Sequence, residues 1–228
     1  VYLPSATHIL DVAYNKGKQF QEWIKSVGYN AKVVSEIAAE LGTRGHHACE
    51  LLLAGDELDY EMFVEGDSRY LPPRYSLDEW KNILKFKDFY DLAQPEDVIS
   101  EGIVYNLEMG YAGTADIICT INGERWLIDL KFGNAIYESY WLQIEAYARC
   151  VEGIDRVGVL HMKSSHKGRD KSGKKLQGKG WILAENPVDR DELFKVWKAL
   201  LEIYKFKNNG LTPKSISLPK KIKLDGTN

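Results

Sequence analysis

The stretch GTADIICTINGERWLIDLK, residues 113–131, decides the fold. Two apolar runs flank the dipeptide Asn122-Gly123, which favours the tight turn of a β-hairpin because both residues tolerate positive φ. We therefore expect antiparallel strands over 115–121 and 125–130, and a further strand over 99–107 before them. The sequence predicts a meander of three consecutive strands.

Charged residues mark the ends of this hairpin. Counting outward from the turn brings Asp116 near Asp129, and alternation along a strand places Asp129 and Lys131 on one face. Buried carboxylates need a cation, and two of them suit Mg²⁺ or Mn²⁺. The alternative is a buried ion pair of Asp129 and Lys131 that Asp116 merely approaches. The spacing alone leaves both interpretations open.

The rest of the chain surrounds this meander with helices. Before it, helical periodicity predicts helices over about 5–27, 35–41, 44–53 and 75–89, with Ser5 or Thr7 as the N-cap of the first and Ser35 as the N-cap of the second. After it, the pattern predicts a helix over 137–151, strands over 156–162 and 181–184, and a helix over 189–207. We expect one α/β domain over 1–228 with a central mixed sheet flanked by helices. Its parts are a mainly helical part (1–97), the catalytic sheet and helices (98–207) and a C-terminal tail (208–228).

Composition narrows the class of protein. With 44% hydrophobic and 28% charged residues and a net charge of −3, a disordered chain is excluded. No apolar run reaches the roughly 18 residues of a membrane span, so we expect no membrane association. Cys49, Cys119 and Cys150 lack C-x-x-C spacing, which argues against a disulfide framework or a thiolate zinc site and favours small core residues. No secretory signal opens the chain, and we expect a cytoplasmic protein.

Charge is distributed unevenly. Residues 1–100 carry 10 basic and 17 acidic side chains, whereas residues 101–228 carry 20 and 16. Basic residues interleaved with glycines predict a loop over 163–179, containing Lys163, Lys167, Arg169, Lys171, Lys174, Lys175 and Lys179. Such a loop is either a solvated surface or a contact to a nucleic-acid backbone, because clustered cations release counterions from phosphates.

Several motifs together resemble one nuclease family. Gly113-Thr114-Ala115-Asp116, followed by Ile128-Asp129-Leu130-Lys131, resembles the PD-(D/E)XK nuclease superfamily. Four further stretches resemble its RecB-like and phage-type exonuclease branch: LPSATHIL at 3–10, AELGTRGH at 39–46 followed by Glu50, SEGIV at 100–104 with Glu101, and the Q-x-x-x-Y pair Gln143 and Tyr147. These motifs lie before residue 150 and in the order seen in that branch.

The resemblance implies a restriction-endonuclease-like core and a set of site residues. The implied metal ligands for Mg²⁺ or Mn²⁺ are His46, Asp116, Asp129 and the Leu130 carbonyl; the spacing from Gly42-Thr43 selects His46 over His47. Lys131 and Glu101 complete the catalytic set, with Glu101 near a second ion. Gln143 and Tyr147 would approach the DNA backbone. Iron-sulfur members use cysteines near the C-terminus; no cysteine follows Cys150, so no cluster is expected.

The implied function is a metal-dependent DNA exonuclease acting in recombination, repair or phage DNA processing. We expect it to act on DNA that is single-stranded or has a free end, and to reside in the host cytoplasm if phage-encoded. A structure-specific endonuclease of the same fold and an inactive nucleic-acid-binding module are the alternatives. A different metal or small-molecule enzyme lacks support, because no phosphate-binding glycine loop, nucleophile elbow or H-E-x-x-H motif is present.

Overall fold

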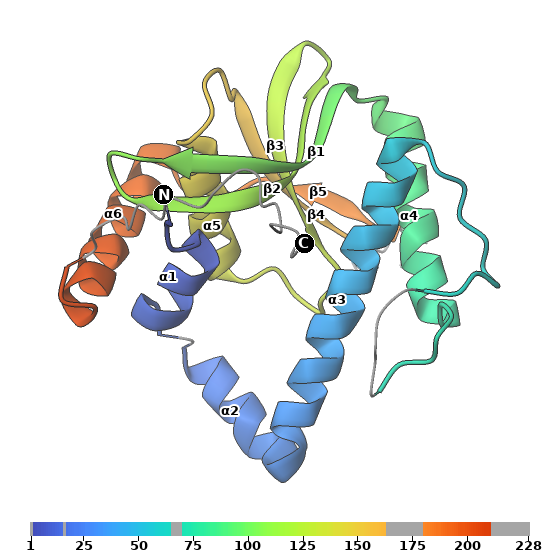
Figure 1. Ribbon diagram of the computed structural model, residues 1–228, viewed down its shortest axis with the longest axis horizontal. Coiled ribbons are helices and arrows are strands. Elements are labelled where there is room, and N and C mark those ends of the chain that lie inside the picture. The colour runs from blue at the N-terminus through green and yellow to red at the C-terminus, as the bar shows by residue number, and fades with distance from the viewer. Residues whose placement is uncertain (1, 16, 65–69, 163–179, 211–228) are drawn as a thin grey trace, which may run out of the picture.

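The protein is a five-stranded mixed sheet flanked by helices, as expected (Figure 1). The computed structural model describes residues 2–15, 17–64, 70–162 and 180–210. The strands are β1 (Glu96–Asn106), β2 (Tyr111–Ile121), β3 (Glu124–Lys131), β4 (Arg156–His161) and β5 (Ile182–Ala184), adjacent in chain order. Antiparallel pairing joins β1, β2 and β3, whereas β4 runs parallel to β3 after the crossover helix α5 (Glu138–Ala148).

The predicted turn between β2 and β3 is confirmed. Asn122 and Gly123 have φ of 53° and 81°, the left-handed conformations that a two-residue hairpin turn requires. Pairing then runs without interruption from Ile121 opposite Glu124 to Ile117 opposite Ile128. The turn therefore sets the register that carries Asp116 and the end of β3 to the same edge of the pairing.

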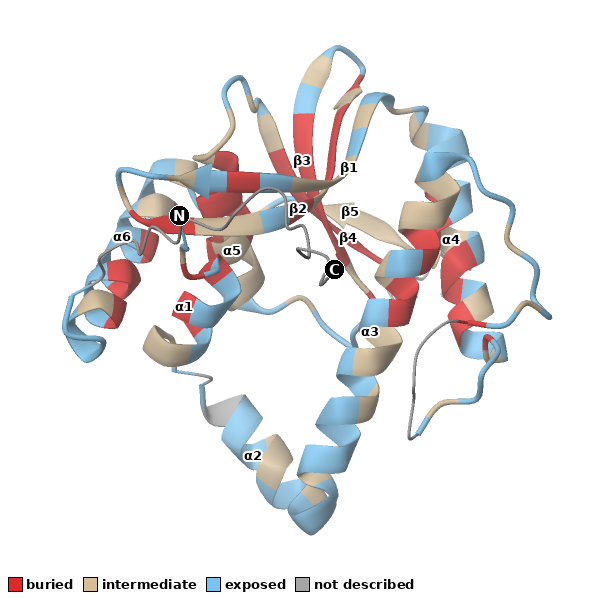
Figure 2. Ribbon diagram, viewed as in Figure 1, coloured by how far each residue is buried: buried red, intermediate tan, exposed pale blue. Residues whose placement is uncertain are grey.

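Helices cover both faces of the sheet. On one face, α1 (Ala6–Ala13), α5 and α6 (Arg190–Lys207) pack over a core that includes Ile118 and Leu127. On the other face, α3 (Ala31–Ala54) and α4 (Leu77–Ala93) pack over a core that includes Ile117 and Ile128. Figure 2 shows buried residues concentrated along the strands between these two sets of helices. Because side chains alternate, Asp129 and Lys131 share the face of Leu127.

The predicted helix boundaries in the first hundred residues are partly wrong. Ser5 caps α1 by accepting the His8 N–H at 3.1 Å. The helix stops at Ala13, however, and α2 (Lys18–Val27) follows as a separate helix, leading into the 3₁₀ turn η1 (Gly28–Asn30).

The predicted helices over 35–41 and 44–53 are one continuous helix, α3, so Ser35 is not its N-cap. Gly42 and Gly45 do not interrupt it. Glycine costs only about 1 kcal/mol in a helix interior, and α3 gains tertiary packing against α4 and β1.

A buried ion pair holds α3 against α4. Arg44 Nε lies 2.8 Å from Glu79 Oε1, and the guanidinium also donates to the carbonyls of Pro72 at 2.7 Å and Arg74 at 2.8 Å. Glu79 also completes a capping box with Ser76 at the start of α4. Both charged side chains are more than nine-tenths buried. This network fixes α3 two residues before His46.

The cysteines occupy the core positions predicted for them. Cys49 and Cys119 are buried, and Cys150 is partly buried. Burial raises the pKa of Cys119 to about 11 and is the main cause that raises the pKa of Cys150 to about 11. The thiols therefore stay protonated at neutral pH.

Two segments predicted from the sequence, the basic loop over 163–179 and residues 211–228 of the tail, lie outside the residues that the structure describes. Of the helices that the structure does describe, none combines the length and apolar character needed to cross a membrane.

Candidate metal centre

Three carboxylates form a row across neighbouring strands. β1 and β2 are paired on both sides of Glu101 and Asp116, which places these two residues opposite one another. β2 and β3 are paired up to the residues that adjoin Asp116 and Asp129, so Asp129 continues the row. The sequence predicted the proximity of the two aspartates from the turn; the position of Glu101 opposite Asp116 comes from the β1 register.

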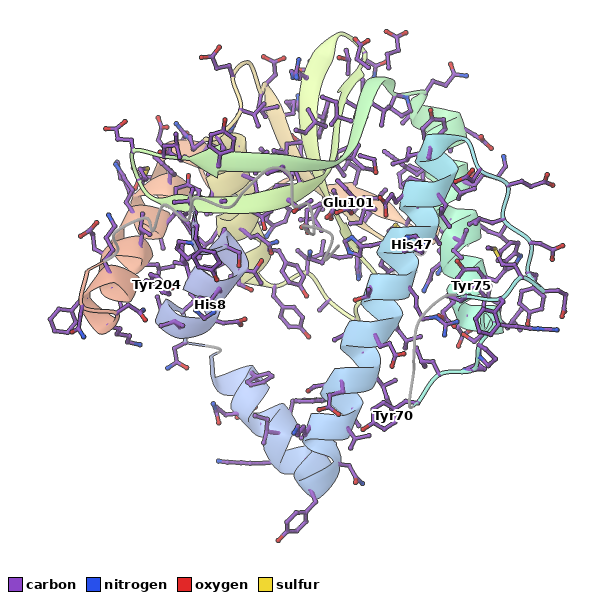
Figure 3. The ribbon with its side chains drawn as sticks, viewed as in Figure 1. His8, His47, Tyr70, Tyr75, Glu101 and Tyr204 are labelled. Carbon is purple, nitrogen blue, oxygen red and sulfur yellow. The ribbon has the colours of Figure 1, made fainter. Side chains whose placement is uncertain are left out.

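A histidine from α3 joins this row. His46 Nδ1 lies 3.4 Å from Asp116 Oδ1. One ligand atom from each of His46, Glu101 and Asp116 lies within 4.8 Å of the others, and we call these three residues the ligand cluster. Figure 3 shows Glu101 at the sheet and His47 on the neighbouring α3. His47 pairs instead with Glu50 at 3.3 Å, and both of these side chains are nearly half exposed. The structure thus brings His46 to Asp116.

Close packing of α3 on the end of β3 accounts for the reach of His46. A Cβ atom at Gly45 would lie 2.8 Å from the ring of Phe132, so only glycine permits this approach without movement of that ring. The same ring meets the His46 imidazole edge-on, with centroids 5.6 Å apart. Gly45 therefore helps to position the histidine that follows it.

Asp129 is held differently from the other predicted ligands. Its Oδ2 lies 2.6 Å from Lys131 Nζ, and both side chains are largely buried. Asp129 does not belong to the ligand cluster found among the described residues. The structure therefore brings together three predicted site residues, His46, Glu101 and Asp116, beside an ion pair of the other two.

Asp116 also links the site to the backbone of β3. Its Oδ2 accepts the Leu130 N–H at 2.6 Å, while its Oδ1 faces His46. Both carboxylate oxygens are thereby oriented. The role of the Leu130 carbonyl as a metal ligand stays a prediction.

The charges of the site reinforce one another. Burial tends to raise the pKa of Asp116, but the hydrogen bond to His46 and the nearby charges lower it below its ordinary value. Burial tends to lower the pKa of His46, but Asp116 raises it above its ordinary value. The same competition at Lys131, burial against the charges of Asp129 and Asp116, ends with a raised pKa. Lys131 is therefore a cation and a hydrogen-bond donor at neutral pH, not a base.

Two carboxyl groups are shifted in the opposite direction. Burial, followed by the charge of Asp116, raises the pKa of Glu101. Burial raises the pKa of Asp129 to about 6, against the lowering effect of Lys131. Each would ionise more readily if a divalent cation neutralised its neighbours.

Glu101 has a strained backbone. Its φ of 51° lies in the left-handed region, within a β-strand, where a side chain other than glycine costs on the order of 1 kcal/mol. We expect Glu101→Gly to be more stable than Glu101→Ala by about 1 kcal/mol, the reverse of the usual order inside a strand. Urea unfolding of the two variants measures the difference. A more stable alanine variant would show that the backbone at this position is unstrained.

The raised pKa of Asp129 predicts a pH-dependent stability. The fold favours the protonated carboxyl. The contribution of Asp129 to the free energy of unfolding is therefore complete below the ordinary pKa of 3.8 and is lost as the pH rises through about 6. Asn imitates the neutral form. Without metal, the unfolding free energy of Asp129→Asn should therefore match that of the wild type near pH 4 and exceed it above pH 6. The gain should be only about 1 kcal/mol, because Lys131 loses one of its two counter-charges in the variant. Thermal unfolding in EDTA across this pH range checks it; a variant less stable at pH 7 contradicts it.

The pair predicted to approach DNA lies on α5. Gln143 Nε2 donates to the Tyr147 hydroxyl at 3.1 Å, and Thr7 Oγ1 lies 3.5 Å from the same oxygen. Tyr147 is 4% exposed and packs against Gly113, where a Cβ would come within 2.1 Å of its ring. The structure thus pairs the two residues and buries the tyrosine. Contact of either with DNA stays a prediction.

Sequence reasoning missed two contacts near the site. Arg44 looked like the start of a helix, and only the fold reveals its buried partner, Glu79. Tyr140 lies with its ring 4.7 Å from Lys131 Nζ. Tyr140 lies nine residues after Lys131, in the crossover helix α5, and no sequence pattern predicts a contact between the two.

The chain matches no protein-family model and no curated protein sequence. The case for its function therefore depends on the geometry of the ligand cluster and its surroundings.

Proposed function

We propose that the protein is a divalent-metal-dependent DNA exonuclease of the PD-(D/E)XK type, with a restriction-endonuclease-like core. The observation that supports it is the ligand cluster, with ligand atoms within 4.8 Å, beside the ion pair of Asp129 and Lys131. One imidazole nitrogen and two carboxylate oxygens fit Mn²⁺ or Mg²⁺. The meander, the crossover α5 and the parallel β4 support the proposed core.

Each residue has a distinct part in this proposal. His46, Glu101 and Asp116 hold the ion, and Asp129 adds charge next to them. A divalent ion held there would supply an acidified water and polarise a phosphate oxygen. Lys131, kept cationic by Asp129, donates a hydrogen bond to the phosphate or orients the attacking water.

The acidic charge of the site is compatible with a polyanionic substrate. A divalent ion reverses the local sign of a carboxylate cluster. The second half of the chain, with 20 basic and 16 acidic residues, supplies favourable charge for the phosphate backbone.

Digestion of labelled DNA tests this proposal. Linear and covalently closed circular DNA, single- and double-stranded, are incubated with the protein in Mn²⁺, Mg²⁺, Ca²⁺ or EDTA. We expect release of nucleotides from linear DNA in Mn²⁺ and Mg²⁺ and none in Ca²⁺ or EDTA. Nicking of closed circles at low protein concentration would favour the endonuclease. Binding without cleavage in every metal would favour the inactive module.

Metal affinity separates the two adjacent histidines. His46→Ala removes a member of the ligand cluster and should weaken Mn²⁺ binding by at least about tenfold. His47→Ala is the matched control, because His47 is exposed and pairs only with Glu50 among the contacts described. Isothermal titration with MnCl₂ measures both variants. A loss of Mn²⁺ affinity confined to His47→Ala would show that His47, and not His46, is the ligand.

A further inference from the structure

The segment between β3 and α5 is fixed near both ends. The His161 Nε2 donates to the Gly133 carbonyl at 2.8 Å, two residues after Lys131. The Tyr14 hydroxyl donates to Glu138 Oε2 at 3.0 Å, at the first residue of α5. The start of α5 is thus held in place beside Lys131. A ligand that binds there therefore spends little free energy on ordering this segment.

Two tyrosines lead outward from Lys131 along this start of α5. The ring of Tyr140 lies 4.7 Å from Lys131 Nζ, a cation–π contact. Tyr137 meets Tyr140 nearly perpendicular, at 84° with ring centroids 5.4 Å apart. Tyr140 is half-buried, whereas Tyr137 is 51% exposed. An edge-to-face contact covers at most one face of a ring, so Tyr140 leaves at least one face of Tyr137 open.

The position of this open ring indicates what it binds. In the proposed function, which this inference presupposes, the scissile phosphate lies at Lys131 and the ligand cluster. The next group along the strand is a nucleobase, and aromatic side chains bind bases by stacking. Inside a duplex both faces of a base are covered by its neighbours, so Tyr137 can stack only on a base at a strand end or on an unstacked base of single-stranded DNA.

We propose that Tyr137 stacks on the end base next to the scissile phosphate, and that the substrate is a DNA end. Tyr140 supports the Tyr137 ring and is itself held by Lys131. Every base has a flat face, so stacking confers no strong sequence preference. Tyr137 is in this account a specificity-determining residue that selects strand ends over strand interiors.

Binding to oligonucleotides with and without terminal bases tests the proposal. Fluorescence anisotropy in Ca²⁺, where we expect no cleavage, measures the dissociation constant of an internally labelled single-stranded 12-mer. A second 12-mer has abasic residues at the three positions of each end, since the polarity is not assumed. A third carries the same number of abasic residues in its interior. The proteins are the wild type, Tyr137→Ala, Tyr137→Leu and Tyr137→Trp.

The expected result is a non-additive pattern. Tyr137→Ala and Tyr137→Leu should bind the ordinary 12-mer about tenfold or more weaker, whereas Tyr137→Trp retains the affinity. The wild type should bind the end-abasic oligonucleotide weaker by the same factor. This comparison does not require any variant protein. Tyr137→Ala should bind the end-abasic oligonucleotide almost as well as it binds the ordinary one. The interior-abasic oligonucleotide should be bound by the wild type like the ordinary one.

Other results overturn the proposal. Equal affinity of the wild type for the ordinary and end-abasic oligonucleotides removes the stacking role. So does the same loss in Tyr105→Ala, a control on β1 whose side chain is 56% exposed. The DNA digestion reports separately on the proposed function: cleavage without a Tyr137 effect rejects only the stacking, and a Tyr137 effect without cleavage rejects only the nuclease.

Discussion

Asp116→Asn is expected to reduce metal-dependent DNA cleavage by about a thousandfold or more. Asp116 contacts His46 with one oxygen and the Leu130 N–H with the other, and it lies in the middle of the carboxylate row. The amide is a weaker metal ligand and carries no charge. Stabilisation by a metal ion is worth several kcal/mol, and each 1.4 kcal/mol corresponds to tenfold in rate.

The fold should survive this substitution. An asparagine oxygen can still accept the Leu130 N–H, and only the charge that faces His46 is lost. We expect a loss of unfolding free energy of about 1 kcal/mol. Initial rates on end-labelled linear DNA in Mn²⁺ measure the activity, and Asp78→Asn, a highly exposed position on α4, is the matched control. Cleavage within tenfold of the wild type would remove Asp116 from the site.

Glu145→Ala should produce the largest loss of stability. Glu145 is completely buried on α5, with Arg149 Nε 2.6 Å from one oxygen and Arg190 Nε 2.9 Å from the other. Removing one member of a buried ion network typically costs 3–5 kcal/mol. Both arginine side chains are 31% exposed and can regain some hydration, so we expect about 2 to 3 kcal/mol.

This network also connects α5 with α6. Arg149 reaches Asp191 at 2.6 Å, and its guanidinium lies 4.8 Å from the ring of Phe194. Urea unfolding measures the loss, with Glu202→Ala on α6 as the control because Glu202 is largely exposed. The control should stay within about 0.5 kcal/mol of the wild type. Equal stability of both variants would mean that the two arginines contribute nothing through Glu145.

Local patterns predicted the sheet well. The turn at Asn122-Gly123 and the alternation in β2 and β3 depend on neighbouring residues, so the meander and the approach of Asp116 to Asp129 follow from the sequence. The same holds for the N-cap Ser5, whose side chain accepts a backbone N–H group.

Features that depend on distant packing were not predictable in this way. Helix α3 continues through Gly42 and Gly45, and Gly45 approaches the ring of Phe132, which is 87 positions away. The left-handed backbone of Glu101 and the capture of Asp129 by Lys131 depend on the assembled sheet. Spacing alone indicated which carboxylates meet, but not which of them face the histidine.

The most direct test of the central claim is anomalous diffraction at the manganese edge from crystals soaked with Mn²⁺ and a short DNA oligonucleotide. We predict a manganese peak at ligand distance from His46, Glu101 and Asp116, with a DNA phosphate oxygen on the same ion. A peak elsewhere, or no peak at these three residues while DNA is bound, would contradict the assignment of this cluster as the place where metal and phosphodiester meet.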